Sequence, residues 1–384
     1  MAGMDYAAHN AQSREVWDAY LAGDPIRVPV TIYADARNWL AEPSENKSGV
    51  TLVDYLRDRQ VMLDVQLRAQ HWIRHTYWSD DGMGLPDGWR ARVDYQNYLE
   101  ASWLGAPVIY GAEPHCRPCL TDGDKRRPFD AGLPAPFSGL CGEAIERYEF
   151  FQSRVGRAGY AGAPLGGVEL PFNMIGSDGP FTLACALRGA SDFMLDMMDD
   201  PDYANELLDC ITDAVIARIR AVRRYLGQPA LGPDFGFADD AIAMLSVAQY
   251  RAFVLPRHRR MFEALSAPEA FRSMHLCGDA QRFFPTIERE LSVRSFDTGF
   301  PIDFGALYEQ LQPRTRVFGG VSAPLLRSGT PDAVRAETRR ILASGVMQKS
   351  GAFVLREGNA LSPGTPPANV AAMFEACRQY GRYR

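Results

Sequence analysis

Short apolar runs alternate with longer amphipathic segments through most of the chain. The apolar runs have the length and the β-branched and aromatic content of buried strands. The segments between them repeat apolar residues at helical spacing, and several begin with proline, which the first turn of a helix tolerates. The predicted strands are 28–33, 106–110, 168–172, 232–237, 271–277, 293–297, 316–321 and 351–355. The predicted helices are 180–198, 201–226, 247–265, 331–342 and 367–380.

Strands that alternate with helices along one chain favour a parallel α/β architecture. We predict a (β/α)8 TIM-type barrel with an N-terminal helical extension. A doubly wound sheet is the alternative, although no GxGxxG or Walker A sequence supports a nucleotide-binding version. Residues 1–90 are less regular and are expected to form the extension, and residues 91–384 the barrel, in one compact domain. Residues 111–140 are rich in proline, glycine and charge, so we expect a loop over the barrel mouth.

Composition narrows the class of protein. The 384 residues are 46% hydrophobic and 23% charged, as in ordinary soluble globular proteins. The net charge of −6 argues against a nucleic-acid partner, which would require a basic patch. Neither a membrane-spanning apolar run nor a signal peptide is visible. The seven cysteines have no disulfide-framework spacing, so we expect free thiols in a reducing cytoplasm.

His275 and Cys277 are the most informative pair in the sequence. They lie at i and i+2 at the end of a predicted strand, so both side chains point the same way. Barrel active sites are built at the carboxyl ends of the strands. An imidazole and a thiolate that converge there provide two of the three protein ligands of a catalytic zinc site. A core histidine beside a buried cysteine is the alternative.

Several acidic residues occupy comparable positions. Asp239 and Asp240 follow the predicted strand 232–237, where a carboxylate can ligate a metal, bind a substrate or transfer a proton. N-capping of the next helix is an equally good interpretation of Asp239 and Asp240. Glu169 lies within a predicted strand and would need a partner or a raised pKa if it faced the interior. Asp297 stands at another strand end and is a candidate substrate or supporting carboxylate.

Two further groups could bind metal but have better alternative interpretations. The segment 115–119 contains a histidine and a CxxC pair, without the second pair that structural zinc requires. His71 and His75 have i, i+4 spacing without an HExxH pattern. We expect the first group to belong to a loop lining the substrate cleft and the second to a helix face.

Four segments together carry a family resemblance. They are 179–189 (GPFT with LRG), 244–256 (MLS with VLP), 275–279 (HLCGD) and 362–370 (SPGTPPANV). The combination resembles the uroporphyrinogen decarboxylase-like superfamily, and it covers roughly residues 165–381 well. The resemblance implies a (β/α)8 barrel. It also implies one of two activities, because the superfamily divides into uroporphyrinogen decarboxylases and cobalamin- or thiol-linked methyltransferases.

The decarboxylase branch has a strand-end segment similar to PVWxMRQAGR, whose arginines bind substrate carboxylates. The matching stretch here is 29–38, where Ala34 and Asn38 stand at the two arginine positions and Arg37 lies one position away. Decarboxylation of a multiply carboxylated porphyrinogen depends on those cations. This departure therefore argues against that reaction.

The methyltransferase branch is the better match because its zinc ligands come from an HxC element, here His275 and Cys277. That branch has a third ligand, a cysteine, just before the PxTPxxN element, and this chain has Asn359 there. We expect water or an oxygen donor to complete the site, chosen from Glu169, Glu357 and Asp239. A harder donor set makes zinc a stronger Lewis acid, which suits an oxygen-bound methyl donor. Loss of the metal is the alternative.

The resemblance implies a zinc-dependent methyltransferase, or demethylase, that moves a methyl group between a small, methoxylated aromatic substrate and cobalamin or a corrinoid protein. A metal-free decarboxylase or lyase and a non-catalytic corrinoid- or small-molecule-binding protein are the alternatives. The expected catalytic residues are Asp239 and Asp240. The expected metal ligands are His275, Cys277, Glu169 and Glu357. The expected substrate-binding residues are Asn359, Asp297, Arg37 and Tyr33. The sequence does not decide the oligomeric state, for which a homodimer is one option.

Overall fold

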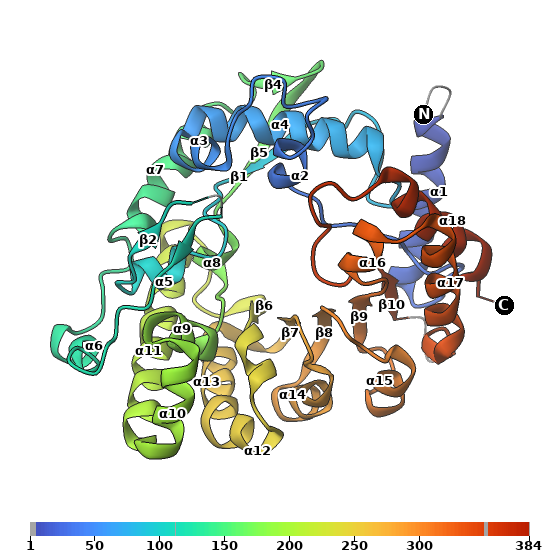
Figure 1. Cartoon of the computed structure of the whole chain (residues 1–384). Coiled ribbons are helices and arrows are strands. Elements are labelled where there is room, and N and C mark those ends of the chain that lie inside the picture. Colours follow the sequence, from blue (N-terminus) through green and yellow to red (C-terminus); the bar gives the residue numbers. More distant parts are fainter. Residues whose placement is uncertain (1–4, 112, 349–351, 384) are drawn as a thin grey trace.

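The computed structural model describes residues 5–111, 113–348 and 352–383. Parallel strands form a ring around a central space, and most of the helices lie outside that ring (Figure 1). The chain is a (β/α)8 barrel, as the sequence predicts. The ring strands are β1 (Trp89–Arg92), β5 (Ala163–Glu169), β6 (Gly232–Ala238), β7 (Ser266–Leu276), β8 (Val293–Thr298), β9 (Arg316–Gly319) and β10 (Phe353–Leu355).

Hydrogen bonding divides the ring into two arcs. Strands β6 to β10 form one parallel sheet in chain order, and β1 pairs in parallel with β5. The segment 28–33 supplies the remaining position, because Val30 forms a parallel bridge to Leu355 of β10. Two ring positions therefore come from the first 92 residues, interleaved with the helical extension. The division of the chain at residue 90 stays a prediction.

The helices start where capping residues and prolines allow. The N-terminal region contributes α1 (Tyr6–Ala22), α2 (Ala36–Leu40), α3 (Leu52–Arg57), α4 (Arg59–Thr76), α5 (Leu99–Trp103), α6 (Arg127–Ala131) and α7 (Leu140–Gln152). The central region contributes α8 (Phe172–Ile175), α9 (Pro180–Arg188), α10 (Ala190–Asp199), α11 (Pro201–Tyr225), α12 (Val247–Gln249), α13 (Leu255–Leu265) and α14 (Phe284–Leu291). The last are α15 (Phe304–Gln310), α16 (Ala323–Ser328), α17 (Pro331–Ile341) and α18 (Pro367–Tyr380). No helix in the described ranges is both long and apolar enough to span a membrane.

Several predicted elements need correction. The predicted helix 180–198 is two helices, because Gly189 between α9 and α10 has φ of 93° and ψ of 133°, which no helix accommodates. The predicted strand 106–110 lies outside the barrel: β2 (Val108–Ile109) pairs antiparallel with β3 (His115–Cys116) in a hairpin. Strand β1 is absent from the sequence prediction, because two of its four residues are arginines. In the predicted strand 351–355, residue 351 lies outside the described residues.

The segment 111–140 does not cover the barrel mouth as predicted. The backbone amides of Cys119 and Leu120 donate to the carbonyl of Leu187 at the end of α9. Arg188 returns a hydrogen bond to the Leu120 carbonyl. These contacts hold the segment outside the ring, where α6 lies at the periphery beside α11 (Figure 1). The described residues of this segment line no part of the central cavity.

Helix α4 closes one side of the ring in an unusual way. Gln70 Nε2 donates to the Arg90 carbonyl at 2.6 Å, and Gln66 Nε2 donates to the Arg92 carbonyl at 2.5 Å. The Arg92 amide donates to Gln66 Oε1 at 2.8 Å. The edge of β1 that faces away from β5 is therefore satisfied by glutamine side chains and not by a neighbouring strand. This α4–β1 seam forms part of the wall of the central cavity.

Candidate active site

A cavity of about 740 Å³ opens at the carboxyl ends of the ring strands. Its lining includes residues that follow the segment 28–33, the ends of β1 and β5, and the ends of β6, β7 and β8. This is the face on which barrel enzymes build their active sites. The cavity therefore gathers side chains from both arcs of the ring.

His275, Cys277 and Asp240 form a group that can hold a metal ion. One donor atom from each lies within 4.8 Å of the others. The strand register explains the meeting, because Ala238 of β6 pairs with His275 of β7, so Asp240 stands level with Cys277. The Cys277 amide donates to Asp240 Oδ1 at 2.7 Å, which fixes that carboxylate beside the thiol. Nitrogen, sulfur and oxygen donors with room for a further ligand match a catalytic zinc site.

Asp297 orients the imidazole of His275. These two residues are partners in the β7–β8 ladder, and His275 Nδ1 lies 2.8 Å from Asp297 Oδ2. A carboxylate only accepts hydrogen bonds, so Nδ1 carries a proton, and Nε2 lies 3.7 Å from Asp240 Oδ1. Burial lowers the pKa of His275, but the hydrogen bond and charge of Asp297 outweigh it, so the pKa is raised. Arg356 Nη1 donates to the other oxygen of Asp297 at 2.8 Å.

Cys277 is a thiol unless a cation stabilises its thiolate. Burial raises the pKa of Cys277 to about 12, and the negative charge of Asp240 adds to the effect. A bound divalent cation reverses this balance, because metal binding displaces the thiol proton. The donor chemistry of the group is therefore suited to a cation and unfavourable to a free thiolate.

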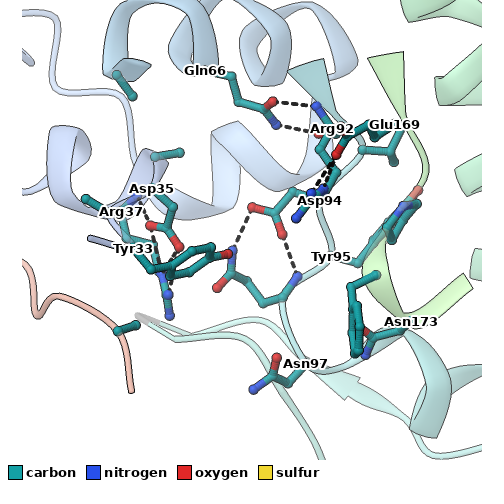
Figure 2. A pocket seen from close by; sticks show the side chains of 18 of the residues that line it. Tyr33, Asp35, Arg37, Gln66, Arg92, Asp94, Tyr95, Asn97, Glu169 and Asn173 are labelled. Carbon is teal, nitrogen blue, oxygen red and sulfur yellow. Dashed lines mark hydrogen bonds and ion pairs between the residues drawn. The ribbon is translucent and has the colours of Figure 1, made fainter. Parts of the chain in front are cut away.

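The structure does not bring the other predicted ligands into this group. Glu357 is fully buried and accepts from the Tyr33 amide at 2.8 Å and from Arg356 at 3.1 Å. Burial raises the pKa of Glu357 to about 7. Glu169 lines the cavity on the opposite arc, where one of its oxygens is bound by Arg90. Its other oxygen is bound by Arg92 (Figure 2). Asp240, predicted as catalytic, stands where an oxygen ligand was expected.

Asp239 has a different environment from the one predicted. Its carboxylate is fully buried and accepts from the amides of Phe181 and Thr182 at the start of α9. His258 Nε2 lies 2.8 Å from the same carboxylate. Asp239 therefore stabilises the first turn of α9, which precedes it in the chain, and its side chain does not cap the helical segment that follows it, so the capping interpretation is wrong. Asp239 lines no part of the cavity.

The predicted substrate-binding residues all line the cavity. Arg37 is committed to Asp35 through three hydrogen bonds, the shortest 2.7 Å (Figure 2). Asn359 has φ of 76°, in the left-handed region where asparagine is enriched. The backbone conformation at Asn359 thus gives a local reason for the asparagine.

Sequence reasoning missed several charged residues of the cavity, among them Asp178, Asp94 and the arginines of β1. Asp178 follows α8, and Asn173 donates to its carboxylate at 2.5 Å. Burial, with the charges of Glu100 and Asp240, raises the pKa of Asp178 well above its usual range. Asp94 also has a raised pKa because of burial. Arg90 and Arg92 belong to the missed strand, and Arg356, also missed, follows β10. A signal for Asp178 was available, since it stands just before the GPFT segment.

The curated relatives include both methyltransferases and decarboxylases. A methylated-thiol–coenzyme M methyltransferase of Methanosarcina mazei is 29% identical over 205 residues, 52% of this chain and 51% of that protein. The methylcobamide:CoM methyltransferase MtbA of the same organism is 25% identical over 218 residues, 56% of this chain and 60% of that protein. The chain thus spans about half to three fifths of these two relatives. A uroporphyrinogen decarboxylase of Rhodococcus opacus is 27% identical over 367 residues, 91% of each chain.

A solved structure supports the fold. It is a methyltransferase from Methanosarcina mazei, with a TM-score of 0.64 and 19% identity over 96% of this chain and 98% of that one. A sequence model of the family described as uroporphyrinogen decarboxylase (URO-D) matches residues 170–380. These residues include β6 to β10 and the candidate metal group. The chain belongs to the uroporphyrinogen decarboxylase (URO-D) family.

Proposed function

We propose that the chain is a zinc-dependent methyltransferase that moves a methyl group between a small methoxylated aromatic compound and a corrinoid on a partner protein. The group of Asp240, His275 and Cys277 is the observation that carries the proposal, because it offers a zinc-type donor set inside a substrate-sized cavity. The methyltransferases among the relatives, one of them named for a methylcobamide, support this reaction class.

The metal donors have defined roles in this proposal. Zinc held by Asp240, His275 and Cys277 would supply Lewis acidity at the oxygen that carries the methyl group. Asp297 keeps Nδ1 of His275 protonated and so directs Nε2 toward the donor group. Arg356 holds Asp297 in place from the other side. The chain of contacts fixes the imidazole before substrate arrives, which is the condition for precise positioning.

Asp178 is the proposed proton donor. Cleavage of the methyl–oxygen bond leaves a negative charge on the substrate oxygen, and a protonated carboxyl group in the cavity can neutralise it. Burial and the charge of Glu100 raise the pKa of Asp178, which favours the protonated form that such a transfer requires. Aromatic side chains on the wall, from Tyr33, Tyr95 and Phe172, suit an aromatic substrate.

We further propose a cytoplasmic location, which seven free cysteines support.

Metal content and methyl transfer test the proposal together. We expect purified protein loaded with zinc to bind one ion, and His275→Ala and Asp240→Asn to lose it. With 4-methoxybenzoate and reduced cobalamin, the wild-type protein is expected to form methylcobalamin, followed by its absorbance, and both variants are expected to fail. His71→Ala is the matched control, because it removes a histidine of α4 that lines no part of the cavity. Equal zinc binding by wild-type protein and His275→Ala would refute the proposed site.

A metal-free decarboxylase is the second candidate, and family membership together with the relative of that name favours it. Full activity on a carboxylated substrate after exhaustive chelation would establish this alternative. Substrate binding without turnover in zinc-loaded protein would instead support a non-catalytic binding protein.

A further inference from the structure

Arg90 and Arg92 place two positive charges on the cavity wall opposite the metal group. They alternate along β1 with Trp89 and Ala91, which are buried in the hydrophobic cluster beneath the strand. Residues two apart on a strand share a face, so both guanidinium groups face the cavity. Their side chains are 68% and 49% exposed, which leaves them accessible to a molecule in the cavity.

The backbone that carries these arginines is held on both edges. On one edge, Arg90 pairs with Gly167 and Arg92 with Glu169 in the parallel ladder with β5. On the other edge, Gln66 and Gln70 of α4 bind the backbone of the same two arginines in the α4–β1 seam. A rigid strand is the support from which a binding group loses least entropy when it binds a ligand.

Glu169 aligns the two guanidinium groups but does not neutralise them both. Arg90 binds Oε1 through Nε at 3.0 Å and Nη2 at 2.9 Å. Arg92 binds Oε2 through Nε at 3.0 Å and Nη2 at 2.5 Å (Figure 2). The arginines outweigh the effect of burial and lower the pKa of Glu169, which stays ionised. Two cations and one anion leave one net positive charge. Among the described residues, neither Nη1 group has a hydrogen-bond acceptor.

Charge across the cavity is therefore asymmetric. At the metal end, Asp240 and the neighbouring Asp297 stand against one arginine, Arg356, so that end favours a cation. The β1 end has the surplus positive charge of Arg90 and Arg92. Asp94, two residues further along, accepts hydrogen bonds from Tyr55 and Gln96, and no bond or ion pair joins it to Arg90 or Arg92 among the described residues. A molecule that spans the cavity is best accommodated with its negative group at the β1 end.

We propose that Arg90 and Arg92 bind a carboxylate of the substrate, while its reacting end faces the metal group. The planar guanidinium group matches a carboxylate through paired N–H donors, and each arginine keeps unused donors for this purpose. The substrate is then a small bifunctional molecule with a carboxylate at the end remote from the transferred group. This inference deepens the proposed function and rests on it for the identity of the reacting end.

Calorimetry with a matched pair of ligands tests the carboxylate site. The probes are 4-methoxybenzoate and its uncharged amide, titrated into zinc-loaded protein. We expect wild-type protein to bind the carboxylate at least about tenfold more tightly than the amide, as charge-assisted hydrogen bonds provide. The Arg90→Gln/Arg92→Gln double variant is expected to lose that preference. Glu169→Gln is expected to strengthen it, because the net charge of the site rises.

Arg37→Gln is the matched control, because Arg37 lines the same cavity but is neutralised by Asp35. It is expected to keep the preference for the carboxylate. Equal affinity of wild-type protein for acid and amide, or no binding of the acid, would overturn the proposal, as would equal losses in the double variant and Arg37→Gln. His275→Ala separates this inference from the proposed function, because the carboxylate preference is expected to survive where zinc binding and methyl transfer do not.

Discussion

Replacement of Glu357 by glutamine tests whether a buried carboxylate behind the site costs stability. Glu357 is fully buried, and only one of its oxygens has hydrogen-bond partners: Oε1 accepts from the Tyr33 amide and Arg356, whereas Oε2 has none among the described residues. Glutamine has the same shape and can keep both hydrogen bonds through its own oxygen. The substitution therefore removes the charge with little change in packing.

The size and sign of the effect follow from the raised pKa. Burial raises the pKa of Glu357 from 4.5 to about 7. Between these values the folded chain holds a proton that the unfolded chain has released, so the free energy of unfolding falls as pH rises through this window. Each pKa unit corresponds to about 1.4 kcal/mol, so the loss by pH 8 is about 3 kcal/mol. Below pH 4.5 this contribution disappears.

Urea unfolding of wild-type protein and Glu357→Gln at a series of pH values measures the effect. We expect the variant to gain about 3 kcal/mol relative to wild type between pH 4.5 and pH 8. Glu169→Gln is a control of opposite sign, because the pKa of Glu169 is lowered, so its carboxylate stabilises the folded chain at neutral pH. A difference between Glu357→Gln and wild type that is constant with pH would refute the reasoning.

Three further substitutions test the site and its support. Asp297→Asn is expected to weaken zinc binding about 10- to 100-fold, measured against a chromogenic chelator, because it removes the carboxylate that orients His275; unchanged affinity would contradict this. Asp178→Asn is expected to slow methyl transfer about 100-fold or more without loss of zinc, because an amide cannot donate the proton; an unchanged single-turnover rate would exclude the role. Arg218→Met is expected to cost about 3–5 kcal/mol in urea unfolding, because it leaves Glu100, 2.5 Å from Arg218 and fully buried, without its cation; a cost under about 1 kcal/mol would contradict the assignment.

The fold could be predicted where local pattern and tertiary packing agree. The predicted helix 367–380 matches α18 (Pro367–Tyr380), and the predicted strand 293–297 lies within β8. The prediction failed where the pattern is set by partners distant in sequence. Strand β1 has arginines at its cavity-facing positions, which hide its strand character from an apolar pattern. The run 106–110 is apolar, yet its partner is a nearby hairpin strand.

The same limit governs the site. The i, i+2 spacing was enough to predict that His275 and Cys277 share a side of a strand end, because strand geometry is local. The position of Asp240 depends on the register of β6 against β7, which places Ala238 beside His275. This register cannot be predicted from the sequence of either segment alone. The partners of Glu169, Arg90 and Arg92, lie 79 and 77 positions earlier in the chain. The local sequence around Glu169 therefore could not show whether this residue binds a metal or forms ion pairs with arginines.

The α4–β1 seam is a part of the barrel wall that is easier to separate than a pair of neighbouring strands. Within each of the two arcs, separating neighbouring strands would break several backbone hydrogen bonds at the same time. At the seam the hydrogen bonds come from the side chains of Gln66 and Gln70, and each such bond contributes about 1 kcal/mol. A substrate wider than the cavity would therefore be accommodated most easily at the seam, where side chains can rotate one after another. The metal group on the other arc would keep its geometry.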